Sequence, residues 1–90
     1  MLSESGIELA RSLTKANPSI GIRMLAKMMI NPLVSIDFDE AIKDIYQLRK
    51  LLTKDQFVIF LKQIIIILTK RHHPEVREKF KEIFQKDYKL

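Results

Sequence analysis

Two adjacent histidines, His72 and His73, are the side chains in this sequence best suited to binding a metal or transferring a proton. Side chains of adjacent residues point in different directions, and the sequence offers no cysteine and no third histidine to complete a ligand set. The next residue, Pro74, suits the first position of a helix. We therefore interpret the pair as a turn before a helix and expect no metal site.

Carboxylates that could form an acid–base pair gather in one stretch of the chain, at Asp37, Asp39, Glu40 and Asp44. Negative side chains at a helix start complement the helix dipole, and Asp37-x-x-Glu40 resembles a capping box. No serine or threonine has a base at a suitable spacing. The two glycines, Gly6 and Gly21, form no phosphate-binding loop. We expect no enzyme, no cofactor and no small-molecule substrate.

Basic side chains are the next candidates, because the chain has a net charge of +5. Residues 1–45 contain five basic and six acidic residues, whereas residues 46–90 contain eleven basic and five acidic ones. A basic half favours nucleic acid or an acidic protein surface as its partner. The candidates for direct DNA or RNA binding at basic helix ends are Arg11, Lys15, Arg23, Lys27, Arg49, Lys50, Lys54, Lys70, Arg71 and Arg77.

The pattern of apolar residues argues against a nucleic-acid recognition helix. The short turn at Asn17-Pro18 is compatible with a helix–turn–helix motif. A recognition helix needs a polar face to reach base edges, but residues 18–30 are apolar nearly all round. Two tyrosines and no tryptophan provide few surfaces for base stacking. Direct nucleic-acid binding is therefore the alternative and not the main interpretation.

The most apolar segment of the chain is 57–68, where ten of twelve residues are apolar. Its four consecutive isoleucines favour a strand, but the flanking residues favour a helix. Thr53-x-x-Gln56 is a capping box, and the cations Lys70 and Arg71 suit the last turn of a helix. The segment is shorter than the roughly 20 apolar residues that cross a membrane. It predicts a central helix over 53–70.

Two isoleucines of this predicted helix, Ile59 and Ile66, lie on the arc opposite its broad apolar face. That face contains Phe57, Val58, Phe60, Leu61, Ile64, Ile65, Ile67 and Leu68. The i, i+7 spacing puts Ile59 and Ile66 together among polar residues. Either other helices of the bundle cover them, or they contact another protein chain.

The predicted helix over 18–30 leaves only a narrow polar strip at Arg23 and Lys27. Its methionines, Met24, Met28 and Met29, fill gaps in the core or form an adaptable binding surface. Gly21 either weakens the helix or lets a neighbouring element approach closely.

Three more helices follow from the apolar periodicity and the prolines. One covers 4–16, with an apolar face of Ile7, Leu9, Ala10 and Leu13. Another covers 37–52 and forms an antiparallel hairpin with the helix over 53–70. The last covers 74–87 and is followed by a tail that frays. Asn17 and Pro18 start the helix over 18–30, and Asn31-Pro32 ends it before an apolar connector at 33–36.

The whole sequence predicts a single domain, residues 1–90, with an all-α fold: a compact bundle of four to five short helices around an antiparallel helix hairpin. The absence of cysteine and of a secretory signal favours a cytoplasmic protein. An excess of lysine and isoleucine is typical of an A/T-rich genome or a thermophile.

The predicted function is a small non-catalytic protein-interaction module. It is an accessory subunit of a larger complex, one that acts in replication, transcription or RNA processing. The partner is a larger protein or a second copy of the chain, and nucleic acid is met through the partner or directly; we expect no membrane association. The candidate partner-binding residues are Ile59, Ile66, Met24, Met28 and Met29.

Overall fold

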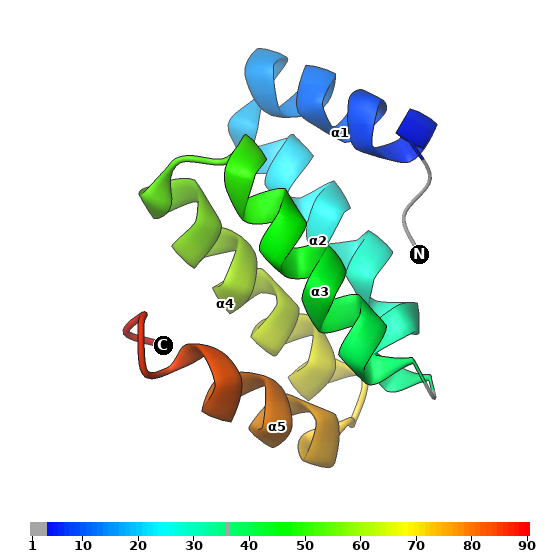
Figure 1. The fold of residues 1–90 in the computed structure, drawn as a ribbon, viewed down its shortest axis with the longest axis vertical. Helices are drawn as coiled ribbons and strands as arrows, with labels where there is room; N and C mark the ends of the chain where they lie inside the picture. The colour runs from blue at the N-terminus through cyan, green and yellow to red at the C-terminus, as the bar shows by residue number, and fades with distance from the viewer. Residues whose placement is uncertain (1–3, 36) are drawn as a thin grey trace.

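The computed structural model describes residues 4–35 and 37–90, without the side chains of residues 4–7, 10 and 13. Within these ranges the chain forms five α-helices, one short 3₁₀ helix and no strand (Figure 1). The elements are α1 (Glu4–Ala16), α2 (Pro18–Val34), α3 (Phe38–Leu48), η1 (Arg49–Leu51), α4 (Lys54–Lys70) and α5 (Pro74–Phe84). The all-α bundle is therefore confirmed, and the isoleucine run lies in α4.

Two helices begin where their capping residues predict. The Asn17 side chain accepts a hydrogen bond from the Ile20 amide at 3.4 Å and caps α2. At the start of α4 the Thr53 hydroxyl accepts from the Gln56 amide at 3.1 Å, and the Gln56 side chain accepts from the Thr53 amide at 3.0 Å. This reciprocal pair is the predicted capping box.

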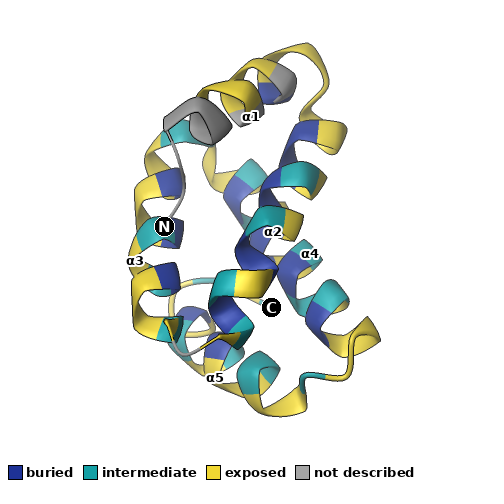
Figure 2. Cartoon of the chain, turned by 90° about the vertical axis from the view of Figure 1, so that its right-hand side faces the viewer, coloured by how far each residue is buried: buried dark blue, intermediate teal, exposed yellow. Residues whose placement is uncertain are grey.

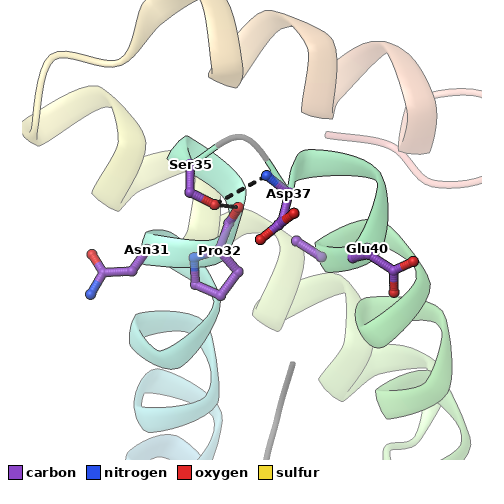
Figure 3. A pocket seen from close by; sticks show the side chains of 6 residues that line it. Asn31, Pro32, Ser35, Asp37 and Glu40 are labelled. Atoms are coloured by element: carbon purple, nitrogen blue, oxygen red, sulfur yellow. Dashed lines mark hydrogen bonds between the residues drawn. The ribbon is translucent and has the colours of Figure 1, made fainter.

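The predicted break at Asn31-Pro32 is wrong, because α2 continues through Pro32 to Val34. A proline in the last turn removes only one donor, and the packing of Leu33, which is fully buried, holds the turn in place. The Ser35 amide donates to the Asn31 carbonyl at 3.1 Å, and the Ser35 hydroxyl donates to the Pro32 carbonyl at 2.9 Å (Figure 3). Of the predicted connector, Ile36 lies outside the described residues.

The limits of α3 also differ from the prediction of 37–52. Asp37 occupies the N-cap position but makes no side-chain capping bond, so the predicted capping box with Glu40 is wrong. Instead, the Asp37 amide donates to the Ser35 hydroxyl at 3.2 Å (Figure 3). The helix ends at Leu48, and its last predicted turn tightens into η1.

The turn between α4 and α5 places His72 in the left-handed region, with φ of 59°. The His73 amide donates to the Leu68 carbonyl at 2.9 Å and the His72 amide donates to the Thr69 carbonyl at 3.2 Å. These two bonds form a Schellman motif, in which glycine is the usual left-handed residue. The histidine pair therefore forms the predicted turn.

The C-terminal segment packs on the bundle, although α5 ends at Phe84 and not at residue 87 as predicted. The Tyr88 amide donates to the Phe84 carbonyl at 3.0 Å. The Tyr88 ring lies 5.3 Å from the ring of Phe57 on α4. Tyr88 is half-buried and packed on the core, which differs from the predicted fraying of the tail.

The core lies between α2, α3, α4 and α5, and the buried residues of these helices are dark blue in Figure 2. α2 packs against α1, α3 and α4, and α5 packs on α4. In Figure 1, α1 lies across the top of the bundle and α5 across its lower end. α3 and α4 run in opposite directions on either side of η1, as the predicted hairpin requires, but the main neighbour of α4 is α2.

The contact between α1 and α2 is close at Gly21. A Cβ atom built on Gly21 would lie 2.5 Å from the Thr14 backbone nitrogen and 2.6 Å from the Thr14 Cα. Gly21 therefore allows a neighbour to approach, which was one of its two interpretations. Leu9 of the predicted α1 face is 53% exposed, so its inward placement is wrong; the side chains of Ile7, Ala10 and Leu13 lie outside the described residues.

Candidate functional site

The outer side of α4 carries two exposed isoleucines. Ile59 is 48% exposed and Ile66 is 44% exposed. Seven residues correspond to about two helical turns, so the two side chains project from the same side of α4. Of the two alternatives for these residues, coverage by the other helices of the bundle is wrong, since both side chains are exposed. We call Ile59 and Ile66 the apolar strip.

The candidate methionines divide between core and surface. Met29 is fully buried and belongs to the core, so its predicted place on a partner-binding surface is wrong. Met24 and Met28 are half-buried. Met29 points into the bundle because α2 packs against three other helices, which leaves only a narrow part of its circumference open.

A groove of about 280 Å³ lies between α2 and α4 and brings four predicted basic residues together. α2 contributes Arg23 and Lys27, which are four residues apart and therefore on one face. The end of α4 contributes Lys70, and Arg71 follows it. We call this the cationic groove; its lining is Arg23, Lys27, Gln63, Ile66, Ile67, Lys70 and Arg71.

The charge of the cationic groove is not compensated by the described part of the chain. All four of its cationic side chains are exposed, and none of its described lining residues carries a carboxylate. The ion pairs among described residues join Arg11 to Glu8, Lys43 to Glu40 and Arg77 to Glu78. The groove therefore presents positive charge that is available to an external anion.

Apolar side chains also line the groove. Ile66 belongs both to the groove and to the apolar strip, so the strip leads directly into it. Ile67 is half-buried and also packs against the core. A surface that combines cations with aliphatic groups can bind an amphipathic anion. The described residues of the groove include no nucleophile and no acid–base pair.

The remaining basic candidates lie elsewhere. Arg49 and Lys54 line a second cavity of about 490 Å³, together with Asp87 and Tyr88. Lys54 and Lys70 are sixteen residues apart on α4, which is roughly 24 Å, so the two basic groups lie at opposite ends of that helix. The Asp87 carboxylate at the second cavity offsets part of its positive charge.

Four further basic candidates join neither cavity lining described above. Arg11 lies 3.7 Å from Glu8 on α1, and Lys15 and Lys50 are exposed. Arg77 is held locally, because its Nε donates to the Glu78 carboxylate at 3.2 Å and its Nη1 donates to the Thr69 hydroxyl at 3.4 Å. The structure therefore separates the ten candidates instead of forming one basic face.

Two carboxylates of the acidic stretch, Asp37 and Glu40, do not face each other (Figure 3). Asp37 and Glu40 line a cavity of about 410 Å³ at the turn between α2 and α3, together with Asn31, Pro32, Ser35 and Ala41. Figure 3 shows the two carboxylates pointing in different directions. Among the residues that the structure describes, no group of histidine and acidic side chains is suited to hold a metal ion.

Gln63 and Ile67 are the residues of the groove that the sequence did not single out. A signal was present, since Gln63, Ile66 and Lys70 follow the i, i+3, i+7 spacing of one helical face. The spacing within this helix could not predict which segment lies next to that face. In the structure it is the side of α2 that carries Arg23 and Lys27.

Comparisons with protein-family models, with curated proteins and with solved structures give no match to this chain. In the described parts of the chain, no helix has both the length and the apolarity to cross a membrane. The candidate site is therefore defined by its own geometry.

Proposed function

We propose that this protein is a small non-catalytic interaction module that acts as an accessory subunit of a larger complex. The observation that carries the proposal is the exposure of Ile59 and Ile66 on one side of α4. An aliphatic side chain gains about 1.5–3 kcal/mol from complete burial, so two half-exposed isoleucines have a substantial part of that gain left to make. A partner surface would supply the burial that the bundle does not.

The charge of the molecule supports a host complex that handles nucleic acid, in replication, transcription or RNA processing. The cationic groove lies beside the apolar strip, and the chain as a whole is basic. In such a complex the larger partner carries the catalysis, and this chain adds contacts to protein and, through the partner, to nucleic acid.

The test is affinity capture from nuclease-treated lysate of the source cells with three forms of the protein. They are the wild type, the variant Ile59→Lys/Ile66→Lys and the matched control Leu9→Lys/Ile20→Lys, whose target side chains are 53% and 54% exposed. We expect one stoichiometric protein with the wild type and the control, and none with the strip variant. Equal capture by all three forms would refute the role of the strip.

Self-association is the form of this proposal in which the partner is a second copy. Sedimentation equilibrium distinguishes it, since the wild type would then form a dimer or larger assembly and the strip variant would be a monomer. The control variant corrects for any effect of added lysines on solubility.

Direct nucleic-acid binding is the second candidate function, and the meeting of Arg23, Lys27, Lys70 and Arg71 in one groove favours it. Neutralising several phosphates makes affinity fall steeply with salt, by about 10³-fold or more between 50 and 200 mM for six or more contacts. With four cations we expect a shallower but clear dependence. No binding to duplex or single-stranded DNA or RNA at low salt would exclude this function.

A further inference from the structure

We propose that the cationic groove receives an acidic amphipathic helix of the partner protein, with the apolar side of that helix on Ile66 and its carboxylates on the flanking cations. This inference rests on the proposed interaction function and identifies the chemistry of the partner. The groove and the apolar strip then form one continuous docking surface across α2 and α4.

The charges of the two helices support an acidic occupant. α2 contains Arg23 and Lys27 and no acidic residue, and the only acidic residue of α4 is Asp55, in its first turn. The four groove cations therefore repel one another without local compensation. Carboxylates arriving from a partner would relieve this repulsion and form charge-assisted hydrogen bonds, of which those to arginine can be bidentate.

The aliphatic groups support a helix as the form of that occupant. Ile59 and Ile66 are separated by about 10.5 Å along α4, which is also the rise between positions i and i+7 of another helix. An amphipathic helix lying along the strip can therefore place an apolar residue against each isoleucine. Its charged residues at the adjoining positions then reach the two sides of the groove.

The uncharged part of the lining disfavours nucleic acid as the occupant of this groove. Ile66 stands among the cations, where a phosphate backbone would cover it without any apolar contact in return. None of the described residues that line the groove is aromatic, so they give bases no surface on which to stack. An acidic amphipathic helix satisfies both the cations and the isoleucine.

The experiment is a titration of ¹⁵N-labelled full-length protein, followed by backbone amide chemical shifts. The probe is a synthetic helical peptide with leucine at i, i+3 and i+7 and glutamate at the flanking positions, and its matched control has glutamine for glutamate. We expect the acidic peptide to shift the amides of Arg23, Lys27, Ile66 and Lys70. We expect the glutamine peptide to bind at least about tenfold more weakly, a difference of about 1.4 kcal/mol.

Variants then test the groove itself. Arg23→Gln/Lys70→Gln and Arg23→Glu/Lys70→Glu should weaken peptide binding about tenfold or more, the charge reversal most strongly. Lys50→Glu/Lys54→Glu is the control for the charge reversal, because it changes the net charge of the protein by the same amount near the opposite end of α4. This control should retain most of the affinity for the peptide. All of these side chains are exposed, so the folded amide spectrum should persist.

Three results would overturn the inference. The first is the absence of shifts at the groove amides up to about 1 mM peptide. The second is tighter binding of a duplex or single-stranded oligonucleotide at these same amides. The third is a concentration-dependent dimer, detected by sedimentation, whose formation prevents the peptide from shifting the groove amides.

The results of the peptide titration can refute this inference without refuting the proposed function. If the peptide does not bind the groove but Ile59→Lys/Ile66→Lys still abolishes capture, the interaction module stands and the acidic partner is refuted. The opposite result is that the peptide binds the groove but Ile59→Lys/Ile66→Lys captures the same protein as the wild type. The groove is then a peptide-binding site, and the proposed role of the apolar strip in the complex is refuted.

Discussion

Replacement of Gly21 by alanine should destabilise the protein, although alanine is the better helix former. In an exposed helix the change would stabilise by about 1 kcal/mol. Here the new Cβ would lie 2.5 Å from the backbone nitrogen of Thr14 and 2.6 Å from its Cα, both well inside van der Waals contact. These are backbone atoms, so no rotation of a side chain can relieve the clash.

The size of the effect follows from these two opposing contributions. Overpacking by one methyl group costs about 1–3 kcal/mol where the surroundings yield, and more where they do not. Because α1 would have to move as a unit, we place the cost at or above the upper end, about 3 kcal/mol. After the gain in helix propensity the net loss is about 2 kcal/mol. A domain of this size has a total stability of roughly 5–13 kcal/mol, so the loss is easily measured.

The assay is urea unfolding followed by far-ultraviolet circular dichroism, with Ser19→Ala on the same helix as the control. Ser19 is exposed, and its replacement should change the free energy of unfolding by no more than about 0.5 kcal/mol. The double variant Thr14→Ala/Gly21→Ala should not recover the loss, because the backbone atoms of residue 14 remain. If Gly21→Ala equals or exceeds the wild type in stability, the close packing of α1 on α2 is refuted.

Three further changes can be measured by the same unfolding assay. Thr53→Ala removes the capping bond at the start of α4 and should lower the free energy of unfolding by about 1 kcal/mol. Asp37→Ala, at an N-cap position without a side-chain bond, should lower it by less than about half of that. Equal losses would refute this difference between the two N-cap residues. His72→Gly should stabilise by about 0.5–1 kcal/mol, because glycine adopts the left-handed conformation without the steric cost that histidine has there, and a loss of stability would contradict that reasoning. Ile59→Lys/Ile66→Lys should change the free energy of unfolding by less than about 1 kcal/mol, since both side chains are exposed, and collapse of the fold would instead assign them to the core.

The sequence predicted the helices well where local chemistry determines them. Capping side chains at Asn17 and Thr53 act only on the next turn, so their effect can be read from neighbouring residues. The sequence-based prediction failed at Pro32, because a proline suggests the end of a helix, whereas the burial of Leu33 keeps one more turn of α2 helical. Packing against distant segments determines where α2 ends, and the local sequence pattern gives no information about that packing.

The candidate site was predicted only in parts. Helical periodicity identified Arg23 with Lys27 and Ile59 with Ile66, because each pair lies on one helix. It also left open whether the isoleucines are covered, and the structure exposes them. That Ile66 lies beside Arg23 depends on how α2 and α4 pack, and this long-range contact has no counterpart in the spacing of residues within either helix.

The packing of α2 explains why the groove lies where it does. α2 is covered by α1, α3 and α4, so the exposed residues of this almost wholly apolar helix between positions 21 and 30 are Arg23 and Lys27. α4 lacks such cover on the side of Ile66, and the two uncovered sides meet at one groove. Gly21 is only two residues from Arg23, and its contact with Thr14 sets how closely α1 approaches this part of α2. Two residues correspond to about 200° around an α-helix, so α1 covers a different side of α2 from the one that carries Arg23.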